Sequence, residues 1–103
     1  MVRIILDKDS INDIPDSPAI FSLSIEDNLT SCWHVGFSNN LRESIRSHFD
    51  PGEPNINIRF LMMSEKPKIL QYETENNGFT EVTKMKIKEW EQQLKPRKLL
   101  IRN

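Results

Sequence analysis

The stretch Trp33–Phe49, WHVGFSNNLRESIRSHF, decides the expected fold of this 103-residue chain. Its first residues predict the end of a strand, and Gly36 predicts a turn. Ser38 can accept a hydrogen bond from an unpaired amide of a first helical turn, so a helix is expected over residues 39–49. Apolar residues recur four positions apart on one face of that helix: Leu41, Ile45 and Phe49.

Alternating apolar and polar residues on either side of this stretch predict an antiparallel sheet of three strands. The expected strands cover residues 19–25, 30–35 and 55–63. On the first of them, Phe21, Leu23 and Ile25 share the face that we expect to be buried. A short apolar run at Val2–Leu6 could form an edge strand or a packed extension.

The C-terminal part, residues 64–103, is expected to be mainly helical. Residues 67–75 fit either a helix that begins at Pro67 or a strand that returns as a hairpin, and we favour the helix. A further helix is expected over residues 81–95, because apolar residues recur at helical spacing until Pro96 ends the pattern. Residues 97–103 form a tail or a short last strand. The fold class is therefore α+β, with a small three-stranded antiparallel sheet flanked by helices.

Composition indicates one globular domain over residues 1–103. Apolar residues make up 37% of the chain and charged residues 28%, which is typical of a soluble protein. No apolar run approaches the roughly 20 residues that cross a bilayer, so no membrane partner is expected. The N-terminal apolar run is too short for a secretory signal, and Cys32 is the only cysteine. These features favour a cytoplasmic location.

The net charge of −1 gives no general support for strong nucleic-acid binding, because proteins that coat nucleic acids are usually basic. Basic residues nevertheless gather in the last twenty positions. They are Lys84, Lys86, Lys88, Lys95, Arg97, Lys98 and Arg102. We interpret them as a solvated helix face and tail in preference to a phosphate-binding patch.

The stretch Pro15–Phe21, the hairpin after it, HVGFSNNLR over residues 34–42 and the helix that follows together resemble the GIY-YIG nuclease domain. The resemblance is closest over residues 15–63. Ala-Ile-Phe at 19–21 takes the place of the Gly-Ile-Tyr motif, and His-Val-Gly at 34–36 takes that of Tyr-Ile-Gly. What the resemblance implies is hydrolysis of a DNA phosphodiester with Mg²⁺ or Mn²⁺ as the cofactor.

The resemblance also implies that reactive groups have been replaced. Phe21 lacks the hydroxyl of the first motif tyrosine, and Ser44 stands where the family has its helix arginine. Loss of one such donor costs about 10²–10³ in rate in other enzymes. His34 replaces the second tyrosine and could act as a base or be structural. His48 matches a position where the family accepts histidine, and it also reads as a helix-end residue near the negative end of the helix dipole.

Three arginines are candidates for contact with a substrate phosphate: Arg42, Arg46 and Arg59. Arg42 and Arg46 lie two residues to either side of Ser44, about 160° round a helix from it, and so favour a solvated ridge. Arg59 faces away from the apolar stripe of the expected third strand and could substitute for the missing arginine.

The glutamate that holds the metal in the family corresponds best to Glu73. Glu75 and Glu81 are the alternatives if the last helices are counted differently. Each of the three would supply the carboxylate oxygen that Mg²⁺ and Mn²⁺ prefer.

Three functional hypotheses follow. The first is a divergent GIY-YIG-like domain with impaired catalysis that binds nucleic acid or protein, since a fold alone does not establish an activity. The second is an atypical metal-dependent endonuclease that uses His34, His48 and Glu73. The third is a structural or assembly protein, such as a homodimer, with no nucleic-acid role.

Overall fold

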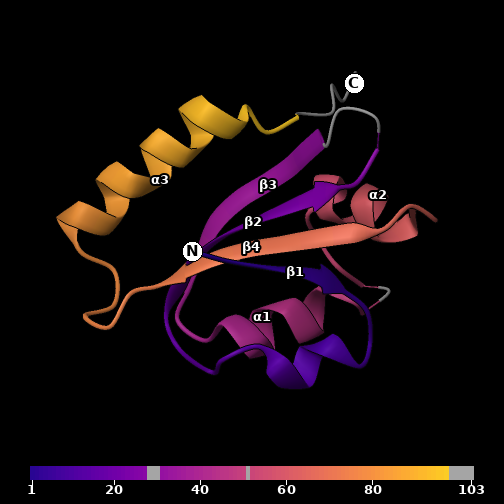
Figure 1. Ribbon diagram of the computed structural model, residues 1–103, viewed down its shortest axis with the longest axis horizontal. Helices are drawn as coiled ribbons and strands as arrows, with labels where there is room; N and C mark the ends of the chain where they lie inside the picture. Colours follow the sequence, from indigo (N-terminus) through magenta and orange to yellow (C-terminus); the bar gives the residue numbers. More distant parts are fainter. Residues whose placement is uncertain (28–30, 51, 98–103) are drawn as a thin grey trace.

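The computed structural model describes residues 1–27, 31–50 and 52–97, and the end of the expected tail lies outside these ranges. The fold is α+β, with a four-stranded antiparallel sheet in the order β1-β4-β2-β3 (Figure 1). The elements are β1 (Val2–Leu6), a short 3₁₀ helix (Ser10–Asp13), β2 (Ala19–Ile25), β3 (Ser31–Ser38), α1 (Leu41–His48), α2 (Ile56–Met63), β4 (Lys68–Thr74) and α3 (Glu81–Leu94).

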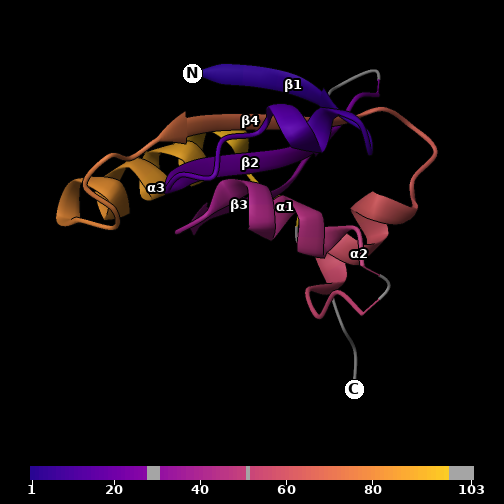
Figure 2. The ribbon, with the colours of Figure 1, turned by 90° about the horizontal axis from the view of Figure 1, so that it is seen from below.

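Helices cover both faces of the sheet. Helices α1 and α2 pack on one face, where Leu41 and Ile58 join Phe21 of β2 in the main core (Figure 2). Helix α3 lies over the other face, since its Lys86 bonds to Glu73, which is paired with Ile20 rather than with Phe21. Side chains on opposite faces of the same strand therefore face different helices.

Strand β2 is the centre of the sheet. The predicted alternation is confirmed, because Phe21, Leu23 and Ile25 belong to the main core. The expectation of a single buried face was incomplete: all seven residues of β2 are buried. Since β2 pairs with β3 on one edge and with β4 on the other and is covered on both faces, even Ser22 is excluded from solvent.

The predicted three-stranded sheet was wrong in two segments, and Val2–Leu6 adds a fourth strand to it. Residues 55–63, expected as a strand, contain helix α2, whose cap Asn55 accepts hydrogen bonds from the amides of Asn57 and Ile58. The buried residues Ile58 and Leu61 are three apart, as on one face of a helix, whereas Phe60 of the expected apolar stripe is 49% exposed. The alternation in this segment was therefore coincidental.

Residues 68–74, for which we favoured a helix, form strand β4. The alternative of a returning strand was correct, and β4 lies between β1 and β2 rather than beside its sequence neighbour. Ile69 and Leu70 are both buried and point to opposite faces, as a strand inside a covered sheet requires. Strand β1 pairs with β4 at the edge of the sheet, so the edge-strand interpretation of Val2–Leu6 is confirmed.

The central segment folds nearly as predicted, with a later helix start. Strand β3 continues through Gly36 to Ser38, so the expected turn at Gly36 does not form. The cap of α1 is Asn40, whose side chain accepts from the amide of Glu43, while Ser38 Oγ accepts from the amide of Asn40. The predicted C-terminal helix is confirmed as α3, and it begins with a capping box.

Candidate functional site

The two histidines singled out from the sequence lie together on the α1–α2 side of the sheet. His34 is paired with Leu23 in the sheet register, and His48 is the last residue of α1. Their ring centroids are 6.5 Å apart. The ring of Phe21 lies 5.5 Å from His34 and 6.2 Å from His48. The structure thus brings three of the predicted site positions into one cluster.

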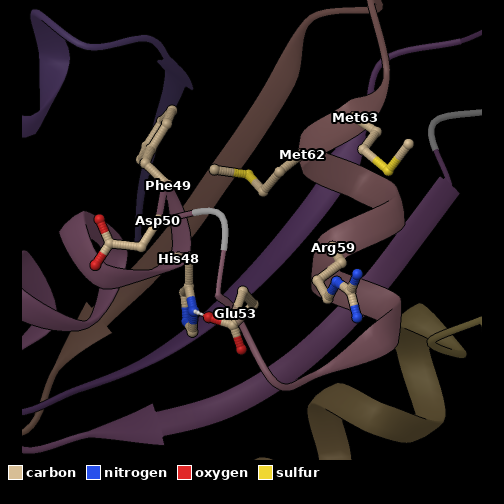
Figure 3. Close-up of a pocket in the computed structure, with 7 residues that line it drawn as sticks. All are labelled: His48, Phe49, Asp50, Glu53, Arg59, Met62 and Met63. Atoms are coloured by element: carbon tan, nitrogen blue, oxygen red, sulfur yellow. Dashed lines mark hydrogen bonds and ion pairs between the residues drawn. The ribbon is translucent and has the colours of Figure 1, made fainter.

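Glu53, which no sequence pattern marked as a site residue, completes this cluster. Its Oε2 lies 2.5 Å from Nδ1 of His48 (Figure 3). Its Oε1 accepts a hydrogen bond of 3.0 Å from the amide of Asn55, the cap of α2. Only 8% of Glu53 is exposed. A buried carboxylate therefore connects the end of α1 to the start of α2.

The surroundings shift the pKa values of two groups in the cluster. Burial lowers the pKa of His34, the nearby charge of His48 lowers it further, and the carboxylate of Glu53 opposes both effects. Burial raises the pKa of Glu53, but hydrogen bonds from His48 and from the backbone of Asn55 outweigh it and hold this pKa below its ordinary value. The cluster thus favours a neutral His34 beside an ionised Glu53.

Acidification from about pH 7.5 to about pH 5 is expected to lower the melting temperature through His34. Because its pKa is lower in the folded chain than the ordinary 6.5, the unfolded chain binds more protons as the pH falls through this window. Stability therefore decreases with falling pH. Glu53 still contributes there, since its stabilisation is lost only below its ordinary pKa of 4.5. Thermal unfolding followed by circular dichroism, with His34→Gln as the control, measures the effect. A wild-type slope no steeper than that of the variant would contradict it.

Because Gly36 has no side chain, it leaves room for the ring of His34. A Cβ added at Gly36 would lie 2.7 Å from Nε2 of His34, whereas one added at Gly52 would meet no atom within 4 Å. Gly36→Ala is therefore expected to displace the imidazole from Phe21 and to destabilise the fold by about 1–2 kcal/mol. Gly52→Ala is the matched control and should change stability by less than about 0.5 kcal/mol. Urea unfolding of both variants tests this, and equal midpoints would refute it.

The remaining predicted positions on α1 are engaged in the fold. The hydroxyl of Ser44 bonds to that of Ser38. Arg42 is not part of a solvated ridge, because its Nε donates to the carbonyl of Ile14 at 2.7 Å and so ties α1 to the segment between the 3₁₀ helix and β2. Arg46 forms an exposed ion pair with Glu43, in agreement with a solvated position.

The three candidate metal-holding glutamates lie away from the histidines. Glu73 and Glu75 both pair with Lys86 of α3, at 3.4 and 2.9 Å, on the opposite face of the sheet. Glu81 is in the first turn of α3. Within residues 1–27, 31–50 and 52–97, no group of three histidine, cysteine, aspartate or glutamate side chains is arranged to hold a metal ion.

A cleft of about 320 Å³ opens beside the cluster, and we call it the α1–α2 cleft. It is lined by His48, Phe49, Asp50, Glu53, Arg59, Met62 and Met63 (Figure 3). Arg59 reaches it from a helix rather than from the expected strand, so Arg59 and His48 are the predicted site residues that line it. The cleft combines apolar walls with one cation and two carboxylates.

Comparisons with protein-family models, with curated proteins and with solved structures found no match to this chain. None of the helices in the described part of the chain has the length and apolar character that a membrane span requires.

Proposed function

We propose that this chain is a divergent GIY-YIG-like domain that has lost ordinary nuclease activity and binds a macromolecular partner through the α1–α2 cleft. The observation that carries the proposal is which residues stand at the positions expected to be reactive and which contacts they make. Phe21 has no hydroxyl, Ser44 bonds to Ser38, and the nearest carboxylate, Glu53, already uses both oxygens within the fold. These positions support the fold and hold no group ready to polarise a phosphate.

The metal implied by the family resemblance does not fit these residues. Mg²⁺ takes oxygen ligands, and the three side chains of the endonuclease hypothesis would supply one carboxylate, Glu73. That carboxylate pairs with Lys86 on the far face of the sheet from His34 and His48. An atypical metal-dependent endonuclease would therefore need a different carboxylate, and Glu53 is the one that lies beside His48.

The proposal predicts that the purified chain leaves supercoiled plasmid intact in Mg²⁺ or Mn²⁺, with no more nicking than His48→Ala. The reason is that the described residues place no preorganised cation at the arginine position, and that the carboxylate in contact with His48, Glu53, is already held by His48 and Asn55. Agarose electrophoresis of the plasmid provides the measurement. Nicking by the wild type that requires the metal and disappears in His48→Ala would overturn the proposal and favour the endonuclease.

We also keep the expectation of a cytoplasmic location. Cys32 is a buried free thiol, and burial raises its pKa, so it is held in the less reactive protonated form. A reducing compartment suits such a residue.

A further inference from the structure

Helix α2 exposes large apolar side chains beside the α1–α2 cleft. Phe60 is 49% exposed and Met63 is 76% exposed. They are three residues apart and so share one face of α2, and Met63 also lines the cleft. Apolar side chains gathered around a hollow are typical of interaction sites, and methionine adapts its shape to different apolar partners.

Inside the cleft, Phe49 and Met62 form an apolar floor. Both side chains pack against the main core, which holds them in place. Figure 3 shows the thioether of Met62 reaching toward the ring of Phe49. The volume of about 320 Å³ is at the lower end for ligand pockets and suits an inserted side chain better than an extended cofactor.

Charged groups border this floor on two sides. Arg59 projects from α2, and Asp50 follows the end of α1 on the other side, with Glu53 between them (Figure 3). Glu53 is already bound by His48. Neither Arg59 nor Asp50 forms an ion pair with another residue in the described ranges. Arg59 thus offers a positive group on one side of the floor, and Figure 3 shows the Asp50 carboxylate at the outer edge of the other side, turned away from Met62.

We propose that the α1–α2 cleft docks a peptide segment of a partner protein, and this inference rests on the binding function proposed above. The peptide inserts an apolar side chain against Phe49 and Met62. It places an acidic residue opposite Arg59 and a basic residue opposite Asp50, which fixes its direction. Exposed Met63 and Phe60 cover the apolar residues at one end of the segment.

A nucleic-acid strand fits this surface less well than a peptide. A phosphate backbone needs several cations along its path, whereas the cleft offers Arg59 together with two carboxylates, Asp50 and Glu53. The whole chain carries a net charge of −1. Apolar rims and mixed charges are instead typical of protein interfaces.

The experiment is a selection of random linear peptides displayed on phage, with the immobilised 103-residue chain as bait. The wild type is expected to enrich peptides in which an apolar residue lies between an acidic and a basic residue. Arg59→Glu should change the acidic preference to a basic one, and Asp50→Lys should change the basic preference to an acidic one. These opposite reversals identify the side of the cleft that each end of the peptide contacts.

One enriched peptide, made synthetically, then tests the apolar contact by isothermal titration. Met63→Ser is expected to weaken its binding about tenfold, which is the size of a moderate interface contact. Met85→Ser is the matched control, because Met85 is also an exposed methionine on a helix, 62% exposed, but lies on α3. It should bind as the wild type does. Both positions are exposed, so both variants should fold, and circular dichroism checks this.

Several outcomes would overturn the inference. They are an absence of enrichment, enrichment without a charge pattern, a pattern unchanged by Arg59→Glu, and equal weakening by Met63→Ser and Met85→Ser. Salt-sensitive binding of an oligonucleotide that Arg59→Glu abolishes would assign the cleft to nucleic acid instead. None of these results restores nuclease activity, and plasmid nicking would refute the proposed function whatever the peptides do.

Discussion

Ile45→Ala is expected to lower the free energy of unfolding by about 3 kcal/mol, within the usual range for such core truncations. Ile45 is 1% exposed and belongs to the main core together with Leu41 and Ile58. Helix α1 has only eight residues, so tertiary packing rather than helix propensity holds it in place. The substitution removes part of that packing and leaves a cavity. His48, at the end of the same helix, should lose its fixed position.

Urea unfolding measures this loss, and thermal unfolding should show a fall of roughly 10–20 °C for a domain of this size. Val82→Ala is the control, because Val82 is 58% exposed on α3. It should shift stability by no more than about 0.5 kcal/mol. Equal losses of stability in Ile45→Ala and Val82→Ala would contradict the packing of Ile45 in the main core.

Glu53→Ala should destabilise the chain by about 2 kcal/mol, which is typical for loss of hydrogen bonds to a buried charged group. The substitution leaves Nδ1 of His48 and the amide of Asn55 without their acceptor. Since Glu53 is the side chain that joins the two helices bordering the α1–α2 cleft, the start of α2 should loosen first. Hydrogen exchange at Asn55 and equilibrium unfolding in urea measure the local and the global effect.

Glu53→Gln distinguishes the two bonds. The glutamine keeps a carbonyl oxygen for the amide of Asn55 but removes the negative charge that His48 contacts, so it should lose less stability than alanine. Equal losses in both variants would show that the contact between the Glu53 carboxylate and His48 outweighs the bond to Asn55. A stable alanine variant would show that Glu53 anchors neither helix.

The elements predicted correctly are those with strong local signals. Strand β2 alternates clearly, and α3 repeats apolar residues at helical spacing until Pro96 follows it. Helix α1 combines a polar cap with regular apolar spacing, so its existence was predicted even though its cap is Asn40 rather than Ser38. Such signals depend on neighbouring residues and need no knowledge of the rest of the fold.

The errors fall where tertiary context decides between helix and strand. The segment NINIRFLMM over residues 55–63 satisfies an alternating pattern and a helical one equally, and Asn55 settles it by capping a helix. Residues 68–74 carry adjacent apolar side chains, which fit a buried helix or a strand covered on both faces. Only the place of β4 between β1 and β2 makes the second solution the right one.

The candidate site was predicted in part. His34 and His48 came from their sequence positions, and the fold brings them together because β3 leads directly into α1. Glu53 was missed because it lies in a proline- and glycine-rich loop that reads only as a break between elements. Its one sequence signal is an acidic residue five positions after a helix-ending histidine, and this spacing becomes meaningful only when the loop folds back.

The sheet order has a consequence for synthesis. Strand β2 lies between β3, which follows it closely, and β4, which begins at Lys68. While the ribosome is still making α1 and α2, the edge of β2 that later pairs with β4 has no partner. A long stretch of sequence between two paired strands slows folding, and unpaired strand edges invite association with other nascent chains. That edge of β2 therefore stays open to such association until residues 68–74 have been synthesised.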